Sequence, residues 1–300
     1  MADTFEDLPL QRSCGAAAMY YRQLEIDPDF QENQRNLEIF TAQARMLGGI
    51  TAKVPAVIKI PVAVHIVYNK DTQNISDAQV ESQIKVLNKD YRAKNTDKNK
   101  VPAVWKHLVA DARIEFHLLK DTKLAITRTK TDKPWFGMNN TVKFTAQGGH
   151  DVYKPESVLN IWICNLAGLL GYAQFPGGNP QTDGVVINFQ AFGTSGTLNP
   201  LYNLGRTATH EVGHWLNLFH IWGDTMDCSG TDKVEDTPKA LDKNYGKPTF
   251  PHVSCNNGPN GDMFVNYMDY VDDAAMFMFT KGQAERMAAT FLGPRNGFVP

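Results

Sequence analysis

Four stretches of this 300-residue chain carry the apolar patterns of β-strands. The longest, VPAVIKIPVAVHIVYN at 54–69, is rich in β-branched residues and is typical of a buried central strand. Shorter apolar runs at 112–120, 158–166 and 184–192 predict three further strands. Between the last two, residues 168–178 form an extended segment closed by Pro and Gly.

Two helices are predicted beside these strands. The segment 76–95 opens with Ser76 and Gln79 at the spacing of a capping box. Its apolar residues recur at helical spacing and share one face: Val80, Ile84, Leu87 and Tyr91. A second helix, 280–292, has Thr280 as its N-cap. The order of elements predicts a mixed α/β (α+β) fold, in which helices pack on a mixed, twisted sheet.

Residues 1–53 differ in character from the rest of the chain. They contain two short helical stretches, of which 35–47 is the stronger, followed by a pair of glycines. Three hundred residues are long for one domain and short for three. We therefore predict an N-terminal appendage, 1–53, and one main domain, 54–300.

Composition argues against two kinds of partner. The net charge is −2 and the basic residues are scattered, which is not the pattern of a surface that tracks nucleic acid. No apolar run approaches the ~20 residues that cross a membrane. The first residues are acidic and lack the apolar core of a signal peptide, which leaves a cytosolic chain or one whose signal peptide has been removed.

The four cysteines bear on that choice. Cys164 lies in an apolar strand, where a free cysteine behaves as a small hydrophobic side chain. Cys228 and Cys255 flank a loop region rich in Asp, Gly and Pro, where a disulfide would take the place of a core and would favour an oxidising compartment. Cys14 stands alone near the N-terminus.

The densest cluster of reactive side chains is THEVGHWLNLFH, residues 209–220. His210 and His214 are four residues apart, so on a helix both imidazoles face one side and can bind one zinc ion. Glu211 lies one step round the helix, where a general base would reach a zinc-activated water. HExxH also occurs by chance on surface helices. The rest of this helix is apolar, however, and buried polar groups need a partner such as zinc.

His220 is the candidate third ligand. It follows His214 by six residues, so it reaches the same ion only if the helix ends near Asn217 and the chain turns back. Asn tolerates the left-handed conformation that such a turn requires. Three histidines leave a fourth position for water, as in catalytic zinc sites. The alternative is a zinc peptidase of another class, in which Glu235 would be the third ligand.

HEVGHWLNLFH resembles the metzincin signature HExxHxxGxxH, with Asn217 in place of the usual Gly, and its surroundings are most similar to the pappalysin family, which includes ulilysin-like proteases. FVNYMDY, 264–270, resembles the metzincin Met-turn and places Met268 beneath the zinc site. Tyr270 matches a tyrosine that in this family lies near the metal and stabilises the tetrahedral intermediate.

The resemblance implies a secreted zinc endopeptidase, with an active-site helix and a C-terminal helix after the Met-turn. Zinc would activate a water, and Glu211 would act as the base. A peptide or protein substrate would lie along the edge strand 168–178, where backbone pairing supplies binding. From its residues alone that segment is equally an ordinary edge strand. The non-enzymatic alternative is a zinc-stabilised binding or adhesion module.

The resemblance also implies calcium and a disulfide after the zinc helix. The acidic loop 223–238 is similar to a calcium-binding stretch of the family, which carries over a set of ligands: Asp232, Val234 through its carbonyl, Asp236 and Thr237. Acidic loops are usually only solvated, so the calcium expectation depends on this similarity. Cys228 and Cys255 match a family disulfide.

The sequence departs from the family at a position that affects which substrate side chain is preferred. Members that cut before Arg or Lys carry an Asp at the floor of the primed-side pocket, near the position that Ala274 occupies here. Asp272 and Asp273 are close in sequence, but the pattern does not tell where they point. With Ala274 at this position, the resemblance favours an apolar or small side chain in the pocket.

QRSCGAA contains an Arg-x-Cys-Gly pattern around Cys14. A thiolate is a good zinc ligand, so a cysteine presented by a pro-segment can take the place of the water and keep the enzyme latent, as among similar proteases. Residues 1–53 would then be a pro-segment, cut between about Ala44 and Val54. Taken alone, Cys14 is equally a stray thiol or a partner for Cys164.

Overall fold

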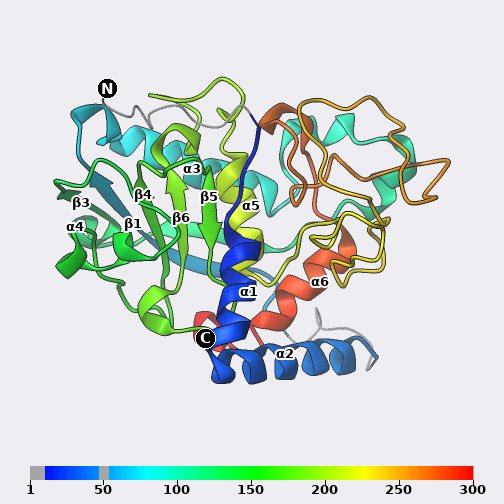
Figure 1. Cartoon of the computed structure of the whole chain (residues 1–300), viewed down its shortest axis with the longest axis horizontal. Helices are drawn as coiled ribbons and strands as arrows, with labels where there is room; N and C mark the ends of the chain where they lie inside the picture. The colour runs from blue at the N-terminus through cyan, green and yellow to red at the C-terminus, as the bar shows by residue number, and fades with distance from the viewer. Residues whose placement is uncertain (1–10, 47–53, 300) are drawn as a thin grey trace.

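The computed structural model describes residues 11–46 and 54–299, with helices packed against one sheet (Figure 1). The strands are β1 (Ile58–Tyr68), β2 (Ile114–Leu118), β3 (Ile126–Lys130), β4 (Leu159–Cys164), β5 (Gly171–Ala173) and β6 (Val185–Asn188). The α-helices are α1 (Ala16–Ile26), α2 (Pro28–Met46), α3 (Asp77–Asp90), α4 (Thr122–Ala125), α5 (Arg206–Trp215) and α6 (Lys281–Thr290). Short 3-10 helices lie in the connections, among them η9 (Asp273–Ala275).

The sheet is mixed, as the sequence predicts. Its strands run in the order β2-β1-β4-β6-β5. β3 also pairs with β1, along the part of β1 that follows the part paired with β2. β1 is long enough for both neighbours, because residues 58–62 pair with β2 and residues 64–68 with β3. Every pairing is parallel except that of β5 with β6. The predicted segment 168–178 therefore contains the antiparallel edge strand.

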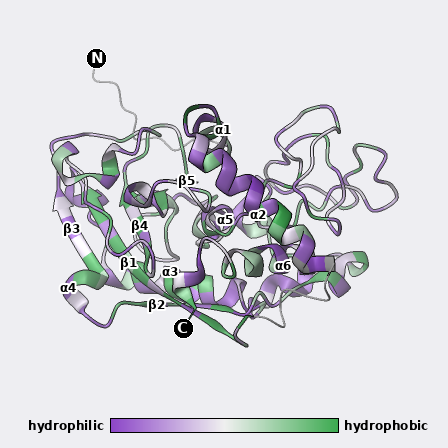
Figure 2. Ribbon diagram, turned by 90° about the horizontal axis from the view of Figure 1, so that it is seen from below, coloured by the Kyte–Doolittle hydropathy of each residue, from purple (hydrophilic) through white to green (hydrophobic). Residues whose placement is uncertain are grey.

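The predicted strands form the buried centre of the molecule. All residues of β4, β5 and β6 are buried, which explains why these segments are continuous apolar runs. Figure 2 shows the hydrophobic colour on β1 and β2 and the hydrophilic colour along much of α2. β3 and α4 are not among the predicted elements, and their short polar segments form against β1.

α3 lies where the sequence predicts the helix 76–95, although it ends earlier. The Ser76 hydroxyl caps it by accepting a hydrogen bond from the backbone N–H of Gln79. The chain leaves helical geometry because Ala93 has a left-handed φ of 46°. The predicted apolar face is buried, with exposed fractions of 9% or less: Val80, Ile84, Leu87 and Tyr91. From this face the Tyr91 hydroxyl donates to a backbone carbonyl of α5 at 3.0 Å, which ties the two helices together.

The region 221–265 has no α-helix or β-strand and is held by polar contacts and one crosslink. Cys228 and Cys255 form the predicted disulfide, and Cys164 is free and buried. Asp269, fully buried, accepts hydrogen bonds from the backbone N–H groups of Asn244 and Tyr270. These bonds anchor the loop region to the predicted Met-turn.

The N-terminal helices pack on the rest of the chain. α1 lies beside β5, and α2 lies against α6 (Figure 1). α6 begins as predicted, because the Thr280 hydroxyl accepts from the backbone N–H of Gln283. The predicted boundary between 1–53 and 54–300 falls at residues 47–53, outside the described residues. Within the part of the chain that the structure describes, no helix is long and apolar enough to cross a membrane.

Candidate active site

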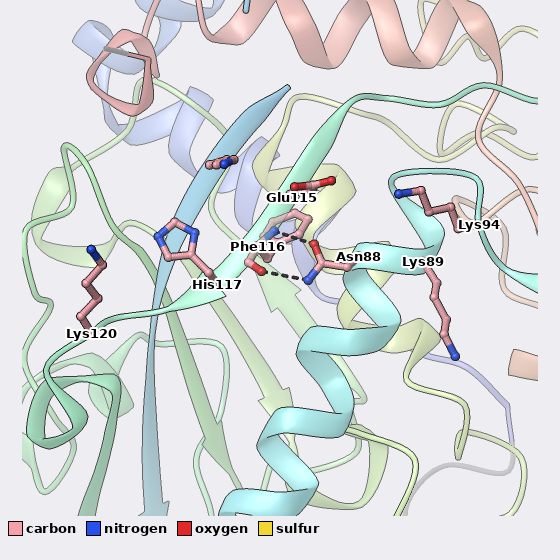
Figure 3. Close-up of a pocket in the computed structure, with 8 residues that line it drawn as sticks. Asn88, Lys89, Lys94, Glu115, Phe116, His117 and Lys120 are labelled. Atoms are coloured by element: carbon pink, nitrogen blue, oxygen red, sulfur yellow. Dashed lines mark hydrogen bonds between the residues drawn. The ribbon is translucent and has the colours of Figure 1, made fainter. Parts of the chain in front are cut away.

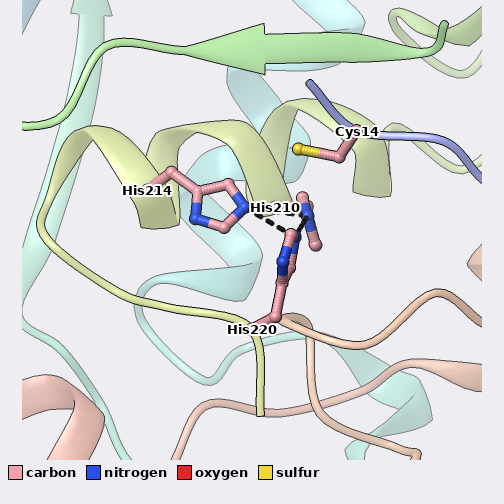
Figure 4. A group of neighbouring side chains, drawn as sticks. All are labelled: Cys14, His210, His214 and His220. Carbon is pink, nitrogen blue, oxygen red and sulfur yellow. Dashed lines mark hydrogen bonds between the residues drawn. The ribbon is translucent and has the colours of Figure 1, made fainter. Parts of the chain in front are cut away.

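Three imidazoles meet where α5 ends and the chain turns back (Figure 4). The Nε2 atoms of His210, His214 and His220 lie 3.1 to 3.3 Å from one another. α5 carries the first two on one face, one turn apart. Asn217 has the left-handed φ of 69° that the sequence predicts, and the turn there brings His220 to the same point.

The hydrogen bonds of the three rings define which nitrogen is free. Each ring donates from Nδ1 to an oxygen at 2.6 to 2.7 Å: His210 to Tyr267 O, His214 to Leu218 O and His220 to Asp224 Oδ1. Because these oxygens accept, the Nε2 atoms carry the lone pairs, and all three lone pairs face one point.

This donor set fits a zinc ion. Zinc binds imidazole nitrogens at ~2.0 Å in a tetrahedral arrangement, and the nitrogen spacings here are close to the edges of such a tetrahedron. Burial lowers the pKa of His210 and His214, so both rings stay neutral, as metal ligands must. Glu235 is absent from this group. Its side chain is 87% exposed and contacts Arg45, so the alternative with Glu235 as third ligand does not fit.

Cys14 is the fourth member of the group. Its Sγ and the three imidazole nitrogens all lie within 4.8 Å of one another. The chain around it runs parallel to β5: Leu170 N donates to Ser13 O and Gly15 N to Gly171 O, both at 2.9 Å. The N-terminal segment therefore adds itself to the edge of the sheet and presents its cysteine to the histidines.

Glu211 lies beside the Cys14 thiol. Its Oε2 accepts a hydrogen bond from Cys14 Sγ at 3.4 Å, while its buried Oε1 has no partner among the described residues. Burial raises the pKa of Glu211 to about 8. Burial and the Glu211 charge both raise the pKa of the Cys14 thiol, so a thiolate here requires a positive charge nearby. An ion held by the three imidazoles would supply that charge.

Close packing fixes α5 from two sides. A Cβ on Gly171 would lie 2.8 Å from the Glu211 side chain, so glycine lets the edge strand pass directly over the carboxylate. A Cβ on Gly213 would lie 2.5 Å from Met268 Sδ. Met268 is fully buried, with its sulfur against α5 at Gly213.

Tyr270 holds the Cys14 peptide. Its hydroxyl donates to Cys14 O and accepts from Cys14 N, both at 3.2 Å. Its ring centroid lies 5.0 Å from that of His220 and 5.8 Å from that of His210. Burial raises the pKa of Tyr270, so the phenol stays protonated and can donate a hydrogen bond.

A basic side chain, Arg12, is 2% exposed and enclosed by polar partners, and this environment is called the Arg12 pocket below. Arg12, two residues before Cys14, places Nη2 2.6 Å from Asp273 Oδ1, and Nη1 donates to Thr207 Oγ1 at 3.1 Å. Ala274 is exposed and does not line this pocket. Asp273, one residue earlier, is instead fully buried and pairs with Arg12.

The predicted calcium ligands divide into two groups. Asp232 Oδ2 and Val234 O lie 2.7 and 3.0 Å from Thr237 Oγ1, and burial raises the pKa of Asp232 to about 7. The Asp236 carboxylate points instead toward α6. Its carboxylate accepts from Thr280 Oγ1 and from a backbone N–H of α6, and so caps that helix.

Sequence reasoning missed Asp224 and Arg12 as partners of the site. Asp224 orients His220. The feature of the sequence that could have revealed this role is the spacing, because Asp224 follows His220 by four residues. Arg12 belongs to the quoted Arg-x-Cys-Gly pattern, so its spacing from Cys14 was the available signal.

A hollow of about 660 Å³ lies away from this site, beside β2 and α3 (Figure 3). It is lined by Lys59, Asn88, Lys89, Lys94, Glu115, Phe116, His117 and Lys120. The Asn88 amide bonds the backbone of Phe116 in both directions at 2.8 Å, which is a structural role. None of the candidate site residues lines this hollow.

Known proteins share this architecture. The Peptidase_M43 family model, described as pregnancy-associated plasma protein-A, matches residues 145–292. An extracellular metalloprotease of Trichophyton verrucosum (strain HKI 0517) is 31% identical over 293 residues, 96% of this chain and 93% of that protein. Mature mirolysin of Tannerella forsythia in complex with a cleaved peptide is 49% identical, with a TM-score of 0.79, over 81% of this chain and 96% of its own. A promirolysin mutant of that organism is 44% identical, with a TM-score of 0.87, over 96% and 97%.

Proposed function

Because this chain belongs to the pappalysin family of metzincin zinc metalloendopeptidases, we propose that Glu211 is its general base and that residues 1–53 keep it latent through Cys14. One observation carries this proposal. Three imidazole lone pairs converge on one point, and a carboxylate with a free oxygen stands beside it. A purely structural zinc site has no use for that carboxylate.

In this proposal His210, His214 and His220 hold the zinc. The ion would polarise the scissile carbonyl and acidify a water. Glu211 accepts a proton from the attacking water and delivers it to the leaving nitrogen. The Tyr270 hydroxyl, kept protonated by burial, donates to the carbonyl oxygen as negative charge develops there.

The position of the N-terminal segment supports the proposed latency. Cys14 takes the place of the water, and its neighbours occupy the backbone groups of β5 that a peptide substrate would pair with. The coverages of the two mirolysins are compatible with a pro-segment of this approximate size. Promirolysin covers 96% of this chain and the mature form 81%, a difference of about 45 residues.

The Arg12 pocket indicates the preferred substrate. When the pro-segment leaves, Asp273 Oδ1 loses its guanidinium partner inside a buried pocket. A buried carboxylate needs a cationic, hydrogen-bonding partner, and arginine supplies one best. We therefore assign to this pocket a preference for Arg, and less for Lys, adjacent to the scissile bond.

Calcium and secretion complete the proposal. Asp232, Val234 and Thr237 turn three oxygens toward one another in a buried loop, which suits a hard cation. The relative from Trichophyton verrucosum is named an extracellular metalloprotease, and the disulfide between Cys228 and Cys255 suits an oxidising compartment.

The decisive experiment is mass-spectrometric profiling of peptides released from a mixed digest. The full chain would first be matured with zinc and calcium present, and Glu211→Ala, which keeps the three histidines, would be the control. We expect cuts that the control lacks, with Arg next to them. If wild type and Glu211→Ala release the same peptides, the zinc-stabilised binding module becomes the better interpretation.

A further inference from the structure

Beyond Cys14, a tyrosine of α1, Tyr20, packs against two phenylalanines. These two residues, Phe175 and Phe219, are called the wall below. Tyr20 is 7% exposed, and its ring centroid lies 4.7 Å from that of Phe175 and 5.1 Å from that of Phe219. The pair with Phe219 is edge-to-face, at 88°. The two phenylalanines are 4.9 Å apart and tilted by 37°. This arrangement is one that aromatic rings prefer.

The wall belongs to the part of the chain that carries the candidate active site. Phe175 follows the edge strand β5 by two residues, and its ring lies 5.5 Å from that of His214. Phe219 immediately precedes His220. Removing residues 1–53 would uncover both rings directly beside the histidines.

Two cationic side chains lie close to the Phe219 ring. The Lys233 Nζ lies 4.5 Å and the Arg286 guanidinium 5.2 Å from its ring centroid. In the full chain Glu38 of α2 pairs with both, with its oxygens 3.3 Å from Lys233 and 3.0 Å from Arg286 Nη1. Without the pro-segment the wall would be an aromatic surface with a cationic rim, complementary to the electron-rich face of another ring.

The direction in which a substrate would run along β5 determines on which side of the scissile bond the wall lies. The pro-segment runs parallel to β5, with Arg12 before the start of the strand and Tyr20 beyond its end. A substrate that pairs antiparallel with β5 runs the other way. It would bring residues before the scissile bond to Phe175 and Phe219, and residues after the bond to Asp273.

We propose that Phe175 and Phe219 form a substrate subsite that takes an aromatic side chain on the N-terminal side of the scissile bond. Tyr20 fills this subsite in the full chain. The inference rests on the proposed proteolytic function and adds a second specificity element to the Asp273 pocket. An aromatic ring fits because it can pack on both phenylalanines at once, as Tyr20 does at 53° to Phe175 and 88° to Phe219, with ring geometry that an aliphatic side chain lacks.

The test uses enzyme matured from the full chain and peptides with Arg fixed after the intended cut. Tyr replaces Ala at each of the three positions before the cut in turn. At one of them we expect Tyr to raise kcat/KM about 10-fold, the size of a favourable aromatic pair. Phe219→Leu and Phe175→Leu should each reduce this ratio of kcat/KM values to about 2.

Phe136→Leu is the matched control, because Phe136 is buried in a separate cluster away from the wall. It should keep the 10-fold ratio. Equal kcat/KM for Tyr and Ala peptides at all three positions, with cleavage before Arg intact, would overturn this inference alone. A Tyr preference only after the cut would overturn it as well. Cleavage of none of the peptides would instead overturn the proposed function.

Discussion

Arg12 and Asp273 form a buried ion pair, with Nη2 2.6 Å from Oδ1 and side-chain exposures of 1% and 0%. The other Asp273 oxygen accepts from the backbone N–H groups of Leu204 and Arg206, which fixes the carboxylate at the pocket floor. Arg12 thus lies two residues from Cys14, the cysteine proposed to block the zinc site. If residues 1–53 are a pro-segment, the full chain displays the kind of group that the proposed mature pocket would bind.

Asp273→Asn should change the specificity of the mature enzyme. The amide keeps the shape of the carboxylate but removes the charge that balances a buried guanidinium. We expect kcat/KM for Arg peptides to fall about 100-fold, because breaking a buried pair is costly, while Leu peptides change little. Paired kinetics on two peptides that differ only at this residue measure the ratio. An unchanged Arg-to-Leu ratio would remove Asp273 from recognition.

Cys14→Ala should abolish latency. The backbone pairing of Ser13 and Gly15 with the edge strand would remain, but the thiol would no longer exclude water from the histidines. We expect the variant to process itself during expression while wild type stays full length. Cys164→Ala, at the other free cysteine, is the control. Equal lifetimes of full-length wild type and Cys14→Ala would contradict the proposal that Cys14 keeps the enzyme latent.

Asp224→Ala should weaken zinc binding without abolishing it. Its carboxylate accepts from His220 Nδ1 at 2.6 Å and so fixes that ring. Loss of such a partner typically lowers metal affinity ~10- to 100-fold. Chelator competition would measure the affinity, with the exposed Asp227→Ala as control. His220→Ala should abolish binding altogether. Full zinc affinity in His220→Ala would restore the case for another third ligand.

Calcium should stabilise the wild type through Asp232. Added calcium binds only the folded loop, so it should raise Tm in proportion to its occupancy. Asp232→Asn should lose this calcium-dependent rise. Asp236→Asn should lower Tm with and without calcium, because that carboxylate caps α6, yet keep the rise. Equal calcium-dependent shifts in wild type and Asp232→Asn would rule out this loop as the site.

The elements that sequence predicts well are those with strong local patterns. β1, β4 and β6 are continuous apolar runs, and Ser76 and Thr280 cap their helices as their spacing predicts. The zinc helix and its turn at Asn217 also follow from residue chemistry alone. Each of these signals depends on residues within a few positions of one another.

What the sequence could not provide depends on contacts across the fold. Whether Asp273 or Ala274 faces the pocket is decided by one turn of η9. The pairing of Arg12 with Asp273 joins residues 261 positions apart, so no local pattern reports it. The hydrogen bond between Asp236 and Thr280 joins residues 44 positions apart, so no local pattern reports it either.

The stability of the fold should depend on pH because of Lys143, a buried lysine near the edge strand. Its ammonium group donates to Thr182 O at 2.6 Å and lies 5.2 Å from the rings of Trp162 and Tyr172. Burial lowers its pKa from 10.5 to about 7. Between these values the unfolded chain binds the proton more than the folded chain does, so stability rises with pH across this window.

Lys143→Met should therefore lose a stability increase that wild type shows between pH 7 and pH 10. Each pKa unit corresponds to about 1.4 kcal/mol, so the lost increase is on the order of a few kcal/mol. Urea unfolding of both proteins at pH 7 and pH 9.5 measures it, and the difference between them cancels other titrating groups. Lys130→Met, at an exposed lysine, should keep the wild-type slope. Parallel stability curves for wild type and Lys143→Met would show that Lys143 stays charged in the folded protein across this range.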